Sequence, residues 1–161
     1  MCGIVGYTGR ADAVTRLLSG LSALEYRGYD SSGIAVFEGK KITVVKAKGR
    51  LDNIRAELEA HPVSSHCGIG HTRWATHGEP SYLNAHPHGT ERLDLVHNGI
   101  VDNYLEWKRF LISHGYDFVS DTDTEVAAKL IDYCYAQTGD PIRAIARATQ
   151  ELTGAYAFGV V

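Results

Sequence analysis

Apolar residues recur along the chain with two periods, one typical of β-strands and the other typical of α-helices. Residues 2–8 form a short apolar run, which predicts a buried strand close to the N-terminus. Leucine and valine then recur at helical spacing between positions 14 and 24, so we expect an amphipathic helix over residues 11–25. Further strands are predicted over residues 34–37, 42–46, 67–73, 93–97 and 155–161.

Turn and breaker residues stand between these elements. Gly39-Lys40 separates two β-rich runs and predicts a hairpin. A short helix around residues 51–58 is stopped by Pro62. The mixture of hairpins and helices indicates an α+β fold in which helices cover antiparallel sheets.

Helices are also predicted toward the C-terminus. Asn103 is expected to cap one that ends at Gly115. Residues 122–125 match a capping box at the start of another, and Asp140-Pro141 places an N-cap and a first-turn proline before a third. The last apolar run is expected to be a buried strand that simply stops, as in a domain truncated at its C-terminus.

The composition is that of an ordinary globular domain. The 161 residues are 44% hydrophobic and 22% charged, and a net charge of −3 leaves no basic excess to attract nucleic acid or an anionic membrane. No apolar run of membrane-spanning length and no signal-peptide pattern occur, so no membrane partner is expected. Cys2, Cys67 and Cys134 form neither a disulfide framework nor a CxxC motif, which predicts a cytoplasmic protein with reduced thiols.

Cys2 follows the initiator methionine, which aminopeptidases remove when the next residue is small. Removal would leave a thiol and a free α-amine on one residue. The ordinary pKa of a cysteine thiol, about 8.5, lies close to that of an α-amine, about 7.7–8.0. The amine can therefore take up the thiol proton near neutral pH, so the nucleophile would carry its own base. The alternative is a structural cysteine at the start of a buried strand.

The motifs that accompany Cys2 favour the nucleophile over the structural cysteine. In chain order they are CGIVGY (2–7), LEYRGYDSSGIAV (24–36), HTRWATHGEPSYLNAHPH (71–88), HNGIVDN (97–103) and SDTDTE (120–125). Together they closely resemble the glutamine amidotransferase domain of the glucosamine-6-phosphate synthase family, a class II (type 2) domain of the N-terminal-nucleophile (Ntn) hydrolases. The resemblance covers essentially the whole chain. It implies a four-layer αββα sandwich and a domain, residues 1–161, that is incomplete at its C-terminus.

The resemblance also implies roles for particular residues. Cys2 would attack the side-chain amide of glutamine, while the Asn98 side chain and the Gly99 N–H would form the oxyanion hole. Arg73 would bind the α-carboxylate of glutamine through its planar guanidinium, and Asp123 would bind the α-ammonium group. Ammonia would leave, and water would hydrolyse the thioester that remains on Cys2.

Other residues are expected to shape the surroundings of this site. Trp74, Thr76 and His77 would complete the glutamine pocket, whereas Arg27 and Asp30 would brace the strand of Cys2. The resemblance implies no cofactor and no metal. In the full-length enzyme, sugar-isomerase domains bind fructose 6-phosphate and receive the ammonia through an internal channel, and the enzyme is expected to form a homodimer. The present chain alone would carry out only the glutaminase half-reaction.

Some of these residues also have a purely local interpretation. Asn98-Gly99 is a common turn dipeptide and is expected to form a turn after the strand over residues 93–97. The Asp123 carboxylate, at the start of a predicted helix, complements the helix dipole. A turn and an oxyanion hole at Asn98-Gly99 are compatible with each other.

Histidines are concentrated between positions 71 and 88, largely on a segment expected to be a long polar loop. The local alternative for His77, His86 and His88 is that they are simply solvated. Together with His71 they would offer nitrogen ligands to zinc, but their spacing matches no standard zinc motif, and we expect no metal site. The segment 121–126 lacks the glycine of a calcium loop, and no phosphate-binding glycine loop occurs.

Other functions share parts of this pattern. The phosphoribosyl-pyrophosphate amidotransferase of the purine pathway, asparagine synthetase and glutamate synthase also use an N-terminal cysteine. The YRGYDS and HTRWATHG segments favour the sugar enzyme over these relatives. An inactive truncated remnant, or a binding module, is the alternative outside catalysis. The sequence favours glutamine hydrolysis that depends on a free N-terminal Cys2.

Overall fold

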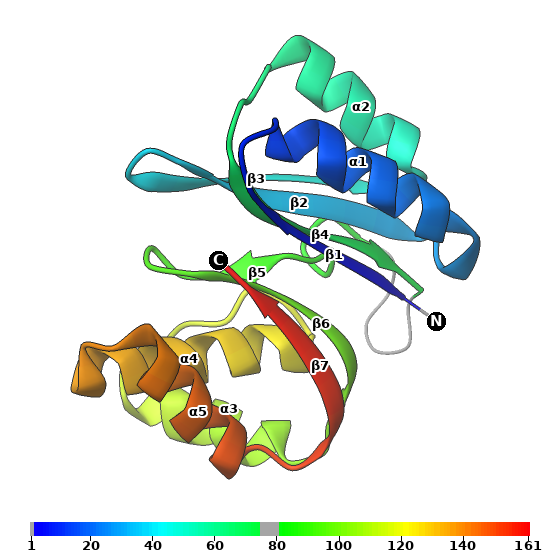
Figure 1. Cartoon of the computed structure of the whole chain (residues 1–161). Helices are drawn as coiled ribbons and strands as arrows, with labels where there is room; N and C mark the ends of the chain where they lie inside the picture. The colour runs from blue at the N-terminus through cyan, green and yellow to red at the C-terminus, as the bar shows by residue number, and fades with distance from the viewer. Residues whose placement is uncertain (1, 75–80) are drawn as a thin grey trace.

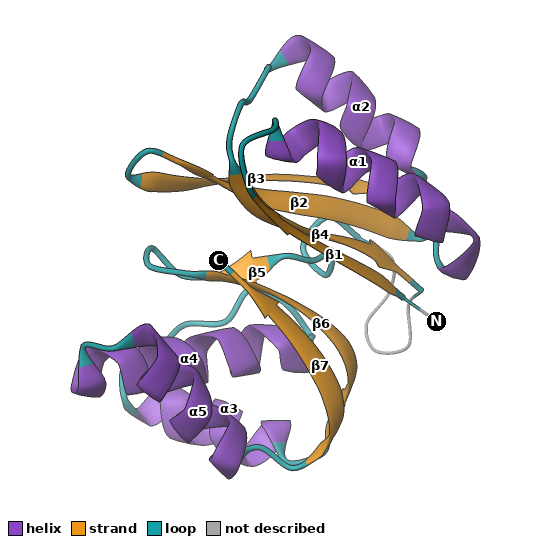
Figure 2. Cartoon of the chain, in the orientation of Figure 1, coloured by secondary structure: helices purple, strands orange, loops and turns teal. Residues whose placement is uncertain are grey.

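In residues 2–74 and 81–161, which the computed structural model describes, two antiparallel sheets lie face to face (Figure 1). Helices cover the outer face of each sheet, so the layers run helix, sheet, sheet, helix (Figure 2). The prediction of an α+β fold with αββα layers is confirmed.

The first sheet has the spatial order β1 (Gly3–Thr8), β4 (Cys67–Arg73), β2 (Ser31–Glu38) and β3 (Lys41–Lys48). All neighbouring strands are antiparallel. Gly39 adopts a φ of 66°, and with Lys40 it forms the predicted two-residue turn between β2 and β3. The outer face is covered by α1 (Ala13–Leu24) and α2 (Leu51–Ala60), and a 3₁₀ turn, η1 (Glu25–Arg27), follows α1.

The second sheet has the spatial order β5 (His88–Gly89), β6 (Asp94–Val101) and β7 (Gly154–Val160). Its outer face is covered by α3 (Tyr104–Ser113), α4 (Asp123–Thr138) and α5 (Pro141–Glu151). Asp140 caps α5 as predicted, because its Oδ1 accepts hydrogen bonds from the N–H groups of Ile142 and Arg143 at 2.9 and 3.0 Å.

Apolar side chains fill the spaces between the layers. One cluster lies between the first sheet and its helices, and another lies between the second sheet and its helices. Ala35, Ile69 and Val96 meet between the two sheets. Residues 31–36 of β2 are buried without interruption because both faces of that strand are covered. Full burial of each leucine or isoleucine side chain contributes about 1.5–3 kcal/mol to folding.

Some sequence expectations about these elements are wrong. None of the residues of β7 is buried, because the strand lies at the edge of the second sheet. Asn103 precedes α3 but does not cap it with its side chain. Instead, Asn103 donates to the Glu151 carbonyl and accepts from the Thr153 N–H, which ties the start of α3 to the connection before β7. Among the described residues, no helix is both long and apolar enough to cross a bilayer.

Candidate active site

A pocket with a volume of about 490 Å³ is lined by residues from the ends of β1 and β4 of the first sheet and by residues of β6 and β7 of the second. Its walls include six of the eight residues that the sequence singled out. These residues are Cys2, Arg73, Trp74, Asn98, Gly99 and Asp123. The other two, Thr76 and His77, lie outside the described residues.

Strand register places Cys2 beside Arg73 and Trp74. β1 and β4 are antiparallel with Gly3 opposite Thr72, so the residue before Gly3 lies at the end of β4. The Trp74 N–H donates to the Cys2 sulfur at 3.2 Å, and the thiol lies 3.5 Å from the Trp74 carbonyl oxygen. These contacts hold the sulfur at the pocket wall.

Asn98 and Gly99 lie within β6, where Gly99 is paired with Tyr156 of β7. The expected turn is therefore wrong, because the strand continues to Val101. Gly99 has a φ of 113°, a value that side-chain-bearing residues rarely adopt, so the strand is distorted at this point. The Asn98 side-chain nitrogen donates to the Cys2 carbonyl at 3.1 Å, which joins the second sheet to the start of the first.

Asp123 is the first residue of α4 and is buried at the pocket wall. Its Oδ2 accepts a hydrogen bond from the Val101 N–H at 2.9 Å, and its Oδ1 lies 3.6 Å from Nδ1 of His97. The carboxylate is thus held by β6 as well as by its own helix. The local interpretation, a charge that complements the helix dipole, is compatible with this position.

Arg73 brings positive charge to the end of β4. Burial lowers the pKa of its guanidinium, while electrostatic interactions with Cys2, Asp30 and Asp123 act in the opposite direction. A guanidinium remains protonated at any physiological pH, so the pocket contains a permanent cation. Trp74 is 46% exposed and packs edge-on against Tyr29, with ring centroids 5.9 Å apart.

The sequence predicts one role for Arg27 and Asp30, but the structure places the two residues differently. The Asp30 N–H donates to the Arg73 carbonyl at 3.0 Å, and this contact braces the end of β4. Arg27 lies in the pocket wall, where its Nε donates to the Tyr26 hydroxyl at 3.0 Å. Arg27 therefore borders the candidate substrate space.

Histidines gather between the sheets, so the alternative that His86 and His88 are simply solvated is wrong. His71, His86, His88 and His97 are all buried. The ring of His86 stacks on that of His71, with centroids 4.1 Å apart, and lies 6.3 Å from that of His97. Burial lowers the pKa of His71 to about 4 and that of His88 to about 3, so both rings are uncharged near neutral pH.

Hydrogen bonds fix the place of these rings. Thr124 Oγ1 lies 3.1 Å from Nε2 of His86 and 3.0 Å from Nδ1 of His97. Within residues 2–74 and 81–161, no group of three or more His, Cys, Asp or Glu residues is arranged to hold a metal ion. The zinc hypothesis that includes His77 involves a residue outside this part of the chain.

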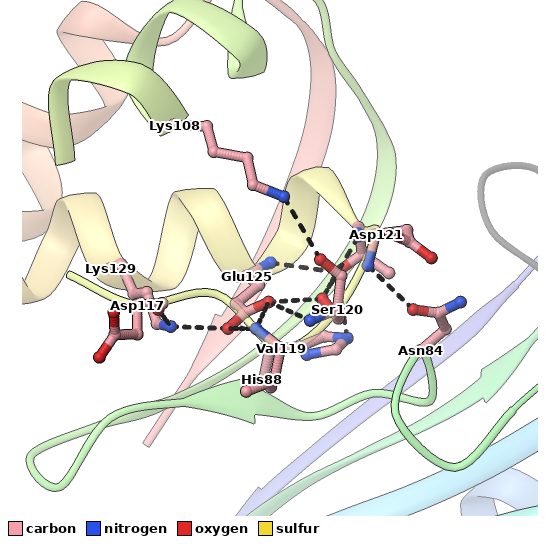
Figure 3. Close-up of polar contacts among 10 residues, drawn as sticks. Asn84, His88, Lys108, Asp117, Val119, Ser120, Asp121, Glu125 and Lys129 are labelled. Atoms are coloured by element: carbon pink, nitrogen blue, oxygen red, sulfur yellow. Dashed lines mark hydrogen bonds and ion pairs between the residues drawn. The ribbon is translucent and has the colours of Figure 1, made fainter. Parts of the chain in front are cut away.

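Glu125 anchors the segment that leads into α4 (Figure 3). Its side chain is 3% exposed, and its carboxylate accepts hydrogen bonds at 2.7 Å from both the N–H and the hydroxyl of Ser120. The Val119 N–H donates at 3.1 Å, and Lys129 Nζ lies 2.6 Å from Oε1. The buried Glu125 carboxylate thus holds the loop before α4 and also binds the Lys129 ammonium group one turn further along α4.

The predicted capping box is only half formed. Thr122 caps α4 by accepting a hydrogen bond from the Glu125 N–H at 3.2 Å. The Glu125 carboxylate does not return to the Thr122 N–H, which donates to the Ser120 hydroxyl instead. Asp121 is held by its N–H bond to the Asn84 side chain at 3.0 Å (Figure 3). The loop is fixed on both sides, and Asp123 follows it directly.

Glu125→Gln is expected to reduce stability in a pH-dependent way. Burial alone would raise the pKa of Glu125, but hydrogen bonds from Lys129 and Ser120 outweigh it and lower the pKa below its ordinary value. Such a carboxylate stabilises the fold above its unfolded-state pKa, and the contribution is lost as pH falls through its folded-state pKa. We expect the variant to be about 1–3 kcal/mol less stable at pH 7.

Urea denaturation at pH 7 and in acid measures this effect. The difference between wild type and variant should shrink as pH falls below the ordinary glutamate value of about 4.3. Glu57→Gln, at an exposed position on α2, is the control and should change stability at neither pH. A Glu125→Gln penalty that stays constant down to acid pH would contradict the role of the charge.

Facing antiparallel sheets between helical layers, with a near-terminal cysteine in the pocket, define the class of N-terminal-nucleophile hydrolases. Residues 81–161 match the family described as "Glutamine amidotransferase domain". The chain belongs to this family.

Curated relatives carry a more specific name. The glutamine–fructose-6-phosphate aminotransferases (isomerizing) of Clostridium acetobutylicum and Clostridium tetani are 52% and 53% identical to the chain over 163 aligned positions. Each alignment covers 100% of this chain and 26% of the relative, so the chain spans about a quarter of the length of these proteins.

A solved structure supports the same class. The glutamine phosphoribosylpyrophosphate amidotransferase of B. subtilis, complexed with ADP and GMP, matches with a TM-score of 0.83 and 30% sequence identity. The match covers 100% of this chain and 35% of that protein. The fold is therefore shared by amidotransferases with different names.

Proposed function

We propose that this chain is the glutamine-hydrolysing domain of a glutamine–fructose-6-phosphate aminotransferase (isomerizing). The main support for this proposal is the pocket, which brings Cys2 together with the cation of Arg73, the anion of Asp123 and the Asn98-Gly99 pair. Free glutamine has a matching α-carboxylate, α-ammonium and side-chain amide. Similarity to the clostridial enzymes supports the sugar-linked reaction over other uses of ammonia.

The proposed reaction begins once Met1 is removed and Cys2 bears a free α-amine. The amine takes the thiol proton, and the sulfur attacks the amide carbon of glutamine. The C–N bond of the tetrahedral intermediate then breaks, and the nitrogen leaves as ammonia with that proton. Water attacks the remaining thioester, which releases glutamate and restores the thiol.

Negative charge on the former amide oxygen is the main electrostatic demand of this reaction. The Asn98 side chain already donates one N–H to the Cys2 carbonyl, and its second N–H would donate to an oxyanion beside Cys2. The Gly99 N–H would supply the other donor. Loss of one such donor typically reduces the rate by roughly 100- to 1000-fold.

Substrate selection would rest on the charged ends of glutamine. Arg73 would bind the α-carboxylate and Asp123 the α-ammonium, with Trp74, Thr76 and His77 completing the pocket. Asp123 is supported for this role by its bond to Val101, which holds its carboxylate in place without neutralising it.

The rest of the reaction would belong to a longer protein. We infer that it carries sugar-isomerase domains which bind fructose 6-phosphate and use the ammonia to make glucosamine 6-phosphate. A cytoplasmic homodimer without nucleic-acid or membrane partners fits this assignment. The competing assignment is a phosphoribosyl-pyrophosphate amidotransferase, which is supported by the structural similarity to the B. subtilis enzyme. Supplying the longer protein with glutamine and either sugar phosphate, and measuring the amino sugar formed, distinguishes the two.

Covalent labelling tests the glutaminase assignment directly. A diazoketone analogue of glutamine should alkylate Cys2 alone, and mass spectrometry of the digested protein should locate one adduct. Cys67 is half-buried and Cys134 is buried, so both serve as internal controls. Absence of an adduct on Cys2 in protein lacking Met1 would favour the inactive remnant.

Arg73→Ala is expected to raise the KM for glutamine by about 10- to 100-fold, which corresponds to the loss of charge-assisted hydrogen bonds to the carboxylate. Arg73→Lys keeps the charge but loses the bidentate geometry, so its KM should fall between those of wild type and the alanine variant. Steady-state glutaminase kinetics measure all three. An unchanged KM in Arg73→Ala would rule out the carboxylate clamp.

A further inference from the structure

The proposed oxyanion hole depends on which end of the Asn98 side-chain amide faces the pocket. A carboxamide has donors at its nitrogen and acceptors at its oxygen, and a half-turn about its last bond exchanges them. The nitrogen would stabilise negative charge on the substrate, whereas the oxygen would repel it. The amide must therefore be held in one orientation.

Contacts from two directions fix that orientation. The Asn98 amide lies 3.1 Å from the Cys2 carbonyl oxygen, which can only accept, so the nitrogen is the end that faces Cys2. Asn98 Oδ1 lies 3.0 Å from Nε2 of His71, which belongs to β4 of the other sheet. Because a carboxamide oxygen also only accepts, Nε2 of His71 must carry the hydrogen.

The ring of His71 is itself held in place. The residue has no exposed surface, and its ring stacks on that of His86 with an interplanar angle of 27°. A Cβ added at Gly33 would collide with the His86 carbonyl oxygen, so the absence of a side chain lets this segment approach β2 closely. Burial lowers the pKa of His71 to about 4, so the ring has a single N–H near neutral pH.

We propose that His71 is a positioning residue, whose Nε2–H holds the Asn98 amide with its nitrogen toward Cys2 and the pocket. The inference rests on the proposed function, because the orientation matters only if Asn98 stabilises an oxyanion. His71 itself is not part of the pocket wall and lies behind Asn98. It acts on the reaction through Asn98 alone.

Matched substitutions at His71 separate this role from simple packing. Glutamine places an amide nitrogen close to the position of Nε2, whereas asparagine places one close to that of Nδ1. We expect His71→Leu and His71→Asn to lower kcat by about 10- to 100-fold, with KM for glutamine changed less than about threefold. His71→Gln should retain at least about a third of the wild-type kcat. A loss in His71→Gln as large as that in His71→Leu overturns the proposal.

A double-mutant cycle tests the route through Asn98. In an Asn98→Ala background the amide is gone, so His71→Leu should cause little further loss of kcat. Losses that multiply in the double variant would mean that His71 acts independently of Asn98, and they would overturn the proposal.

The tautomer of His71 provides a readout that needs no activity. In wild-type protein labelled with ¹⁵N-histidine, long-range ¹H–¹⁵N spectra should show His71 with its proton on Nε2. A proton on Nδ1 overturns the inference even if glutamine is hydrolysed. If wild type neither hydrolyses glutamine nor reacts at Cys2, the proposed function fails, while the tautomer still decides whether His71 orients the amide.

Discussion

Protein that keeps any residue in front of Cys2 is expected to hydrolyse glutamine at no more than about one-thousandth of the rate of protein that begins with Cys2. A peptide bond to a preceding residue converts the α-amine into an amide, which cannot take up the thiol proton. Cys2 also lies at the pocket wall against Trp74, so extra residues at its nitrogen would extend from the reaction site itself. Glutamate release before and after cleavage of a removable N-terminal tag measures the effect in one preparation.

Substitutions of cysteine provide the controls for this experiment. Cys2→Ala should abolish turnover with Met1 removed, because the amine remains but the nucleophile is gone. Cys67→Ala should keep wild-type kinetics, since Cys67 starts β4 at the end of the strand opposite Arg73. Equal rates for tagged and processed protein would show that the α-amine is not the base, whatever Cys2 itself contributes.

Elements with strong local signals were predictable from the sequence. The cap and first-turn proline at Asp140-Pro141 require only neighbouring residues, and α5 begins where they predict. Gly39-Lys40 similarly forms its hairpin turn with contacts that lie within a few residues. In such segments the preferred backbone conformation and the final fold agree, so periodicity and turn chemistry are sufficient.

The Asn98-Gly99 turn failed because a distant strand decides the conformation there. Asn-Gly is a strong turn signal, but the pair lies opposite Ala157 and Tyr156, which are more than fifty positions later in the chain. Pairing with β7 therefore keeps the segment extended. The positive φ of Gly99 is its one turn-like feature. Local conformational propensity contains no information about a strand partner so distant in the sequence.

Burial of the histidines was also decided by distant contacts. The segment that carries His86 looks like a polar loop, yet Lys46 of β3 reaches across and donates to the carbonyls of Ala85 and Pro87 at 3.0 and 3.2 Å. Burial lowers the pKa of Lys46, and the nearby carboxylates oppose that shift. The loop can enter the interior because a lysine from another strand satisfies its backbone.

The candidate site, too, depends partly on local sequence signals and partly on contacts between distant segments. The sequence could suggest that Cys2 reacts, but no spacing rule places it beside Arg73, 71 positions later in the chain. The β1–β4 register produces that neighbourhood, and the resemblance to known amidotransferases anticipated it. The contact of His71 with Asn98 was not predicted, because Asn98 belongs to the other sheet. Only the facing of the two sheets brings a histidine of β4 to an asparagine of β6.

Gly99→Ala is expected to lower the free energy of unfolding by about 2–5 kcal/mol. The φ of 113° at this position is unfavourable for any residue with a Cβ. An added Cβ would also overlap the Ala155 carbonyl oxygen of the neighbouring β7 strand, which is backbone and cannot swing aside. The two strands would have to separate at the point where the Gly99 N–H would meet the oxyanion. We therefore also expect glutamine turnover by the folded fraction to fall by about 100-fold or more.

Two other glycines separate the causes of this loss. Gly115 has a φ of 87° and no atom within 4 Å of an added Cβ, so Gly115→Ala isolates backbone strain, at about 1 kcal/mol. Gly6 has neither a positive φ nor a close neighbour, so Gly6→Ala should be nearly neutral. Urea denaturation ranks the three variants by their free energy of unfolding. Glutaminase assays on the same samples measure the effect on turnover in the pocket. If Gly99→Ala is no less stable than Gly115→Ala, β7 does not pack against Gly99 as described, because the strain term alone would then account for the loss.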